Sequence, residues 1–249
     1  MFYHSGRNIA LTEYGVALQE ALTPVLKTLH QIPNQLQQLA QERETTIRLN
    51  VLAASTLVTQ ALISYKKDHD GLNFQLFQNS QCEDADITVF TRENFQIPAG
   101  NKDRYELFKE RIFLAVPADS PYASEESVRR KDFAHQDFIS LSGSRSIRTI
   151  CDRYCMQAGF VPHIIYESDS PDTVKNLIAS GLGVGFWPHY TWSTDSMEQI
   201  RLMPIAEPTC QRAIILQLHR HARVQEAVCS FYAFLNRYLR QLKAAEKTG

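Results

Sequence analysis

Hydroxyl side chains gather at three places where a predicted strand gives way to a predicted helix: Ser55 and Thr56, then Ser142 with Gly143 and Ser144, then Ser168 with Ser170. The start of a helix presents unpaired backbone N–H groups and a partial positive charge, which together can bind an anion. In an open parallel sheet, ligands bind beyond the carboxyl ends of the strands. The three starts therefore predict a site for a small organic anion, most simply a carboxylate. Serine and threonine are also the commonest helix caps, so capping alone explains any single start equally well.

Two arginines follow the second group of hydroxyls. Arg145 and Arg148 fall in the first turns of the predicted helix, where a cation opposes the helix dipole by about 0.3–1 kcal/mol. A bound anion would offset that cost, so Arg145 joins the predicted site. Solvated surface arginines are the alternative for each of the two.

The sequence lacks several common catalytic motifs. It contains no GxSxG, no HExxH, no P-loop, and no GxGxxG after a strand. The glycines of residues 181–185 follow a helix and precede a strand, which predicts a tight turn and not a dinucleotide site. His219 and His221 lack a third metal ligand and are best explained as surface or structural histidines. We therefore predict a protein that is not an enzyme and needs neither a metal nor a cofactor.

Composition narrows the class of protein further. The chain has 249 residues, 44% of them hydrophobic and 21% charged, and a formal net charge of −1. That charge argues against nucleic-acid binding by the body of the chain, because such binding needs a basic patch. No apolar run reaches the roughly 18 residues of a membrane span, and the N-terminus has no apolar signal core. The sequence therefore predicts a cytoplasmic protein.

The five cysteines show no metal-ligand spacing. Cys151 and Cys155 lie one helical turn apart on an apolar face of a predicted helix. Free cysteine behaves as a small hydrophobic residue, so we expect both side chains to be buried in a core.

Residues 12–45 form a long amphipathic pattern. Apolar residues recur in steps of three and four, which is a heptad seam: Leu18, Leu22, Val25, Leu29, Ile32, Leu36 and Leu39. Such a seam needs a partner helix, most simply that of a second copy, so we predict a homodimer or homotetramer. The alternative is a helix that lies on its own domain. Pro24 and Pro33 each disfavour a helix interior, so we expect a kink or a division into two or three segments.

The rest of the chain alternates strands and helices. Strands are expected at residues 47–53, 72–77, 85–91, 110–116, 138–141, 163–167, 184–187 and 212–218. Helices are expected after residues 55, 144 and 170, and over 223–242. This order predicts an α/β fold with a mostly parallel sheet, in two units of similar size.

Several segments resemble LysR-type transcriptional regulators in the order in which they occur. GRNIALTEYG (residues 6–15) resembles the wing and the start of the linker helix, and IRLNVLAASTL (47–57) the first strand and helix of the effector domain. DADITVF (84–90) and ERIFLAVPADSPYA (110–123) follow. The most specific match is CMQAGFVPHIIYESDSPDTVKNLIASGLGVGFWP (155–188), and IILQLHRHARVQEAVCSFYAFL (214–235) closes the series.

The resemblance implies two Rossmann-like subdomains hinged by two crossing strands, like type II periplasmic binding proteins, after a long linker helix. Subdomain I would comprise residues 46–116 and 211–249, and subdomain II residues 117–210. It also implies an oligomeric DNA-binding regulator gated by a small molecule in the cleft between the subdomains. By position, the cleft would be lined by Ser55, Thr56, Asn79, Ser80, Ser142, Gly143 and Ser144.

Residues 1–11 would be the remnant of a winged helix-turn-helix, with His4 and Arg7 nearest the DNA. The DNA-reading helix of the family has no counterpart, so we expect this chain alone to bind DNA weakly or not at all. Between Gln78 and Asp86 the family has a helix where only a turn fits here. The alternative function is a stand-alone small-molecule-binding module without a role on DNA.

Overall fold

The computed structural model describes residues 1–5, 8–78, 82–143, 145–192, 198–206 and 208–245. Two compact units are present, Met1–Thr46 and Ile47–Gly249. Each is considered by itself below. Among the described residues, no helix is long and apolar enough to cross a membrane.

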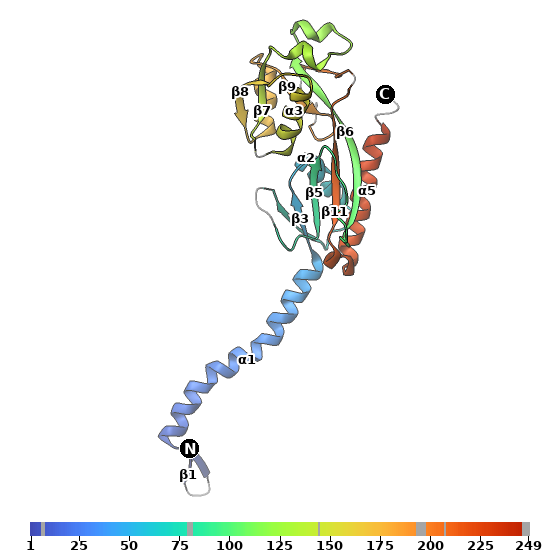
Figure 1. The fold of residues 1–249 in the computed structure, drawn as a ribbon. Helices are drawn as coiled ribbons and strands as arrows, with labels where there is room; N and C mark the ends of the chain where they lie inside the picture. Colours follow the sequence, from blue (N-terminus) through green and yellow to red (C-terminus); the bar gives the residue numbers. More distant parts are fainter. Residues whose placement is uncertain (6–7, 79–81, 144, 193–197, 207, 246–249) are drawn as a thin grey trace. The chain divides into compact units, whose positions relative to one another are not determined.

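The first unit is a hairpin followed by one long helix (Figure 1). Strands β1 (Phe2–Ser5) and β2 (Asn8–Leu11) pair antiparallel. Helix α1 (Glu13–Thr45) then begins at Thr12, whose Oγ1 accepts a hydrogen bond from the backbone N–H of Gly15 at 3.2 Å. A Cβ at Gly15 would collide with the carbonyl oxygen of Met1, which already accepts the Thr12 N–H at 2.9 Å. Glycine therefore lets the helix pack against the hairpin.

Helix α1 runs without interruption through Pro24 and Pro33. The expectation of separate helical segments is therefore wrong. Proline has a helical φ and removes one backbone hydrogen bond, while the other residues of this 33-residue helix continue to propagate it. The axis of the helix bends along its length (Figure 1), as expected for a helix with internal prolines.

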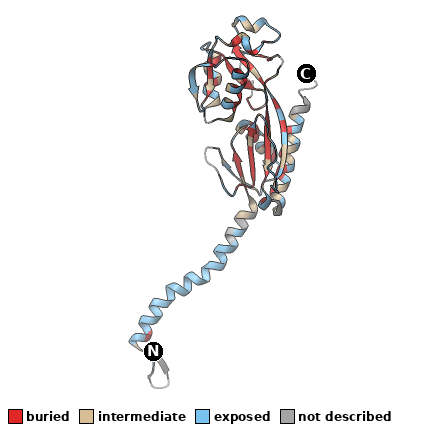
Figure 2. Cartoon of the chain, in the orientation of Figure 1, coloured by how far each residue is buried: buried red, intermediate tan, exposed pale blue. Residues whose placement is uncertain are grey.

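The second unit contains two hydrophobic cores, seen as separate groups of buried residues in Figure 2. In the first core, β3 (Thr46–Val51) lies between β4 (Asn73–Phe77) and β5 (Ile87–Arg92). The order continues through β11 (Gln211–Leu218) to β6 (Arg104–Pro117). Helix α2 (Ser55–Lys66) and helix α5 (Glu226–Ala245) cover this sheet, and Tyr65 of α2 donates a hydrogen bond to Ser230 of α5 at 3.0 Å.

The second core lies around the other half of β6. That half pairs with β9 (Gly185–Pro188) and β10 (Ile200–Met203), while β7 (Asp137–Leu141) pairs with β8 (His163–Ser168). Helices α3 (Ser146–Gln157) and α4 (Pro171–Ala179) pack on these strands. Short 3-10 turns at Pro121–Ser124, Arg130–Phe133 and Arg220–Val224 complete the described helical segments.

Two crossing strands connect the two cores. β6 pairs with β11 over residues 104–111 and with β9 and β10 over residues 112–117. The chain returns beside it, where the N–H of Ile112 donates to the carbonyl of Cys210 at 2.9 Å. This is the expected architecture of two α/β subdomains hinged by two crossing strands.

Three details of the sequence prediction are wrong. The sheets are mixed: β6 and β11 pair antiparallel with their neighbours, and parallel pairing occurs at β3–β5 and β7–β8. A strand that leaves one core and a strand that returns to it must run in opposite directions. β6 begins at Arg104 and not at Glu110. The prediction missed its first half, in which charged side chains alternate with apolar ones on a half-buried surface. Strand β10 was not predicted.

Several local predictions are confirmed. Ser170 caps α4 and Pro171 occupies its first position. Gly181 has a φ of +79°, as a helix-terminating glycine requires, and a Cβ at Gly183 would lie 2.6 Å from the carbonyl oxygen of Asp137. Cys151 and Cys155 are both buried, and Cys151 is part of the second core.

Candidate functional site

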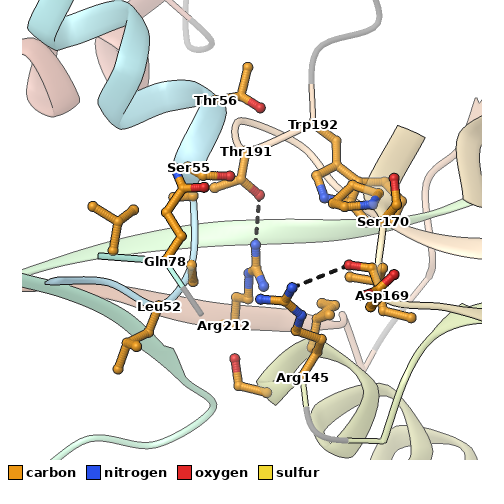
Figure 3. A pocket seen from close by; sticks show the side chains of 17 residues that line it. Leu52, Ser55, Thr56, Gln78, Arg145, Asp169, Ser170, Thr191, Trp192 and Arg212 are labelled. Atoms are coloured by element: carbon orange, nitrogen blue, oxygen red, sulfur yellow. Dashed lines mark hydrogen bonds between the residues drawn. The ribbon is translucent and has the colours of Figure 1, made fainter. Parts of the chain in front are cut away.

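A cavity of about 290 Å³ opens between the two cores of the second unit (Figure 3). We call it the cleft cavity. Its walls come from the starts of α2, α3 and α4, from the turn after β9, from the end of β4 and from β11. The lining residues are Val51, Leu52, Ala53, Ala54, Ser55, Thr56, Gln78, Leu141, Arg145, Ser146, Ile147, Asp169, Ser170, Pro171, Thr191, Trp192 and Arg212.

The start of α2 forms one wall and is conformationally unusual. Ala54 precedes the helix with a φ of 60° and a ψ of 33°, a left-handed conformation that non-glycine residues rarely adopt. The structure gives no side-chain cap for this helix within the described residues, and Ser55 and Thr56 of its first turn line the cavity. Strained backbone of this kind gathers at functional sites.

The start of α3 forms the opposite wall. Arg145 precedes this helix, for which no side-chain cap is found among the described residues. Nη2 of Arg145 donates to the backbone carbonyl of Asp169 at 3.3 Å. Ser146 shares a hydrogen bond of 2.6 Å with Thr91 of β5. This wall therefore presents an arginine and a hydroxyl to the cleft cavity.

The start of α4 is capped by its own side chains. Ser170 Oγ accepts from the N–H of Thr173 at 3.4 Å, and Ser168 Oγ accepts from the N–H of Ser170 at 3.1 Å. Ser170 still lines the cleft cavity, whereas Ser168 does not line it and instead holds the turn before α4 through its bond to Ser170.

A buried ion pair joins Arg212, which forms part of the cavity wall, to Glu110. Arg212 of β11 is 4% exposed and donates from Nε to Glu110 Oε2 at 2.7 Å; the Glu110 side chain is fully buried. Glu110 Oε1 accepts the backbone N–H groups of Tyr190 and Thr191 at 2.8 and 2.7 Å. Nη2 of Arg212 donates to Thr191 Oγ1 at 2.6 Å. These bonds fix the guanidinium at the cavity, and Figure 3 shows the one between Arg212 and Thr191.

Four residues of the predicted anion site lie together at the cleft cavity: Ser55, Thr56, Arg145 and Ser170. Ser142, Gly143 and Ser168 do not line it, and Asn79, Ser80 and Ser144 lie outside the described residues. Arg148 is held away by two carboxylates, Asp152 at 2.7 Å and Glu167 at 2.6 Å.

Sequence reasoning missed six polar or aromatic lining residues: Gln78, Ser146, Asp169, Thr191, Trp192 and Arg212. For Arg212, the sequence did contain one indication of its buried position. Both Arg212 and Glu110 stand at the head of an apolar run that forms a buried strand, and opposite charges in such places usually pair.

The heptad seam of α1 is a second candidate site. The described seam side chains are 38–61% exposed in this chain: Leu18, Leu22, Val25, Leu29, Ile32 and Leu36 (Figure 2). The side chains of Leu39 and His4, and Arg7 as a whole, lie outside what the structure describes. An exposed apolar stripe of this length marks an interaction surface.

Comparison with known proteins identifies the family. The family described as the LysR substrate binding domain matches residues 40–240. The chain belongs to this family. Its LysR-type relatives include two proteins of Bacillus subtilis, the regulator YybE and the transcriptional dual regulator GltC. YybE is 26% identical over 86% of this chain and 75% of its own length. GltC is 23% identical over 98% of this chain and 84% of its own length.

Solved LysR-type structures share the fold. The regulatory domain of Synechocystis CcmR in complex with 2-PG has a TM-score of 0.66 at 14% identity, covering 77% of this chain and 96% of that one. The effector-binding domain of QuiR in complex with shikimate has a TM-score of 0.62 at 17% identity, covering 79% and 97%. Full-length OxyR from Pseudomonas aeruginosa has a TM-score of 0.63 at 17% identity, covering 96% and 83%. The LysR effector-domain fold expected from the sequence is therefore confirmed.

Proposed function

We propose that this chain is the sensor of a LysR-type transcriptional regulator and that it binds a small organic anion, most simply a carboxylate, in the cleft cavity. The observation that carries the proposal is the convergence of three helix starts and two arginines on one cavity of about 290 Å³. It would act in the cytoplasm and without catalysis, and it would reach DNA only through the partial winged helix-turn-helix of residues 1–11.

Electrostatics favours an anion in this cavity. No described side chain caps the start of α2 or α3, so the N–H groups and dipoles there can act on a ligand. Arg145 and Arg212 add hydrogen-bond donors that suit a carboxylate. The QuiR and CcmR domains, which share this fold, hold shikimate and 2-PG. These observations together support a carboxylate or similar anion over an apolar ligand.

Movement of the two cores would connect the ligand to regulation. Lining residues come from both cores, and the cores are joined by the crossing strands. A ligand that contacts both sides favours the closed arrangement by its differential affinity. We propose the limits 46–116 with 211–249, and 117–210, for the two moving subdomains.

Thermal shift and calorimetry on the full chain test the ligand class. We expect a panel of carboxylates to include compounds that raise the melting temperature, because binding stabilises the folded state. Thr56→Ala should weaken such a ligand about fivefold, the equivalent of one lost hydrogen bond of about 1 kcal/mol. Arg145→Ala should weaken it by roughly tenfold or more, because a charged donor is lost.

Thr59→Ala is the matched control, since Thr59 is exposed on the same helix and does not line the cavity. Its affinity should equal that of the unmodified chain. If no carboxylate binds, or if Thr56→Ala and Arg145→Ala both leave the affinity unchanged, the cleft cavity is not the sensor.

We also propose that the heptad seam pairs α1 with α1 of a second copy. Leu22→Glu with Leu29→Glu places two charges in an apolar stripe and should turn the oligomer into monomers in light scattering. Gln37→Glu, at an exposed position of α1 outside the seam, should leave the mass unchanged. Equal masses for all three proteins would rule out pairing through the seam.

A further inference from the structure

The charges at the cleft cavity nearly cancel. Among the described residues, three charged ones line it: Arg145, Asp169 and Arg212. Arg212 is neutralised from behind by the buried carboxylate of Glu110, at 2.7 Å between Nε and Oε2. Arg145 and Asp169 have opposite charges and are adjacent, joined by the hydrogen bond of 3.3 Å from Arg145 Nη2 to the Asp169 backbone carbonyl. The lining therefore provides strong donors without a large net positive charge.

Arg212 can offer a ligand a hydrogen-bond donor, while its charge is already paired with Glu110. Its Nε and Nη2 are taken by Glu110 and Thr191, at 2.7 and 2.6 Å. No hydrogen bond of its Nη1 to another described residue is found, although the side chain is 96% buried (4% exposed) and lines the cavity. A buried guanidinium with an open donor at a cavity wall is suited to one acceptor oxygen of a ligand.

Asp169 sets an upper limit on the ligand's negative charge. Its side chain is exposed and lines the same wall as Ser170 and Pro171. Like charges at contact distance repel each other near a protein surface. A second carboxylate or a phosphate on the ligand would meet that repulsion, whereas a hydroxyl or ammonium group would find an acceptor.

The remaining polar lining is neutral and able both to donate and to accept hydrogen bonds. It consists of five hydroxyls and one amide: Ser55, Thr56, Gln78, Ser146, Ser170 and Thr191. Such groups match a ligand that carries its own donors, because an apolar ligand would leave them without partners. A cavity of about 290 Å³ lies at the lower end of the sizes typical of ligand sites.

We infer that the effector is a small monocarboxylic acid carrying several hydrogen-bond donors, a hydroxy acid or an amino acid, and not a dianion. This inference rests on the proposed function, that the cleft cavity binds an anion. The carboxylate would lie at the starts of α2 and α3 with Arg145 and Arg212, and the hydroxyl or ammonium groups would face Asp169 and the lining hydroxyls.

Matched probes test the inference on the full chain by calorimetry and thermal shift. Gluconate and glucarate differ only in a terminal CH₂OH or carboxylate, and hexanoate has the same chain length without hydroxyls. Glycerate, tartronate and L-serine repeat the comparison at smaller size and separate hydroxyl from ammonium donors. We expect at least one of gluconate, glycerate and L-serine to bind about tenfold more tightly than its dianionic or donor-free counterpart.

Two variants test whether Asp169 causes the preference for monoanions over dianions. Asp169→Asn should narrow the preference for the monoanion over the matching dianion by roughly three- to tenfold, chiefly through tighter dianion binding. Asp172→Asn is the control, because this carboxylate lies three residues further on, in the first turn of α4, is 83% exposed and does not line the cavity. It should leave the preference unchanged.

The outcomes separate the two proposals. If no probe binds with a dissociation constant below the millimolar range, the proposed anion site fails and the inference fails with it. The inference about the ligand class is wrong if the dianions or hexanoate bind as tightly as the matched hydroxylated monoanions. The anion site still stands in that case, provided that Arg145→Ala weakens binding. An unchanged preference in Asp169→Asn also contradicts the inference.

Discussion

Thr91 and Ser146 share a hydrogen bond of 2.6 Å between their hydroxyl oxygens, and this bond joins β5 of the first core to the start of α3 in the second. Thr91 is fully buried, and Ser146 lines the cleft cavity. Close by, Arg153 of α3 donates to Glu93, which follows β5, at 2.7 Å. Helix α3 is therefore tied to the first core at two points, and one of them lies at the cavity wall.

Thr91→Val removes one hydroxyl at nearly constant shape. We expect the free energy of unfolding to fall by about 1–3 kcal/mol, because the partner hydroxyl loses its bond in a partly buried place. Urea denaturation measures the change. Thr149→Val, at an exposed position of α3, is the control and should stay within about 0.5 kcal/mol. Equal midpoints for both variants would show that the Thr91 hydroxyl contributes nothing.

Local patterns in the sequence predicted the parts that depend on local physics. The helix start at Ser170, the burial of Cys151 and the turn at Gly181 were all foreseen, because each depends on a few neighbouring residues. The convergence of the three helix starts followed from the rule for parallel strands. It holds although the sheets are mixed, because each of the three helices follows a strand of a parallel pair: α2 follows β3, α3 follows β7 and α4 follows β8.

Long-range pairing was not predictable in the same way. Glu110 and Arg212 are 102 positions apart, and no local pattern says that they meet. The first half of β6 was missed because its charged side chains interrupt the apolar run, and its pairing with β11 is seen only in the fold. Asp169 and Trp192 lie in turns whose direction is set by the surrounding core.

The Glu110–Arg212 pair allows a double-mutant cycle. Glu110→Gln leaves a buried guanidinium without its carboxylate, and Arg212→Gln leaves a buried carboxylate without its cation. Each should lower the free energy of unfolding by about 3–5 kcal/mol, as for other buried pairs that lose one partner. The double variant should cost clearly less than the sum, since neither charge remains.

Chemical denaturation of the four proteins measures this coupling. Asp132→Asn is the control from the surface, because Arg129 and Asp132 form an exposed pair at 2.9 Å. Its cost should lie within about 0–1 kcal/mol. Additive costs of the two substitutions at Glu110 and Arg212 would show that the pair does not act as a unit.

Two glycines provide a test of close packing. A Cβ at Gly183 would lie 2.6 Å from the backbone carbonyl oxygen of Asp137, whereas a Cβ at Gly143 meets no atom within 4 Å. Gly183→Ala should therefore cost about 1–3 kcal/mol, because the backbone must shift. Gly143→Ala should be neutral within about 0.5 kcal/mol. Thermal or urea unfolding decides between them, and a neutral Gly183→Ala would contradict the close contact.

The cysteines should divide by reactivity. Burial raises the pKa of Cys155 to about 12 and that of Cys210 to about 12. Burial also raises the pKa of Cys151 well above its ordinary value. These three thiols stay protonated near neutral pH and are poor nucleophiles. Ellman's reagent at pH 8 should therefore modify Cys82 and Cys229 quickly in the native protein and all five cysteines after denaturation. Rapid native labelling at Cys155 would contradict this order.

His219 should make the folded state sensitive to acid. Burial lowers the pKa of His219, and nearby His221 lowers it further, while Asp103 and Asp86 act in the opposite direction. The neutral ring fits its partners: Nε2 lies 2.8 Å from Thr88 Oγ1, and Nδ1 lies 3.4 Å from the amide nitrogen of Gln217. The unfolded chain therefore binds a proton at this residue before the folded chain does.

The direction of the pH effect follows from that difference. As pH falls from about 7 through the unfolded pKa of about 6.5, the unfolded state takes up more protons and the free energy of unfolding decreases. His219→Gln removes this titration, so its stability should fall less between pH 7.5 and about 5.5 in urea denaturation. His135→Gln, at an exposed histidine, should follow the unmodified chain. Parallel curves for His219→Gln and the unmodified chain would show that His219 does not cause the acid sensitivity.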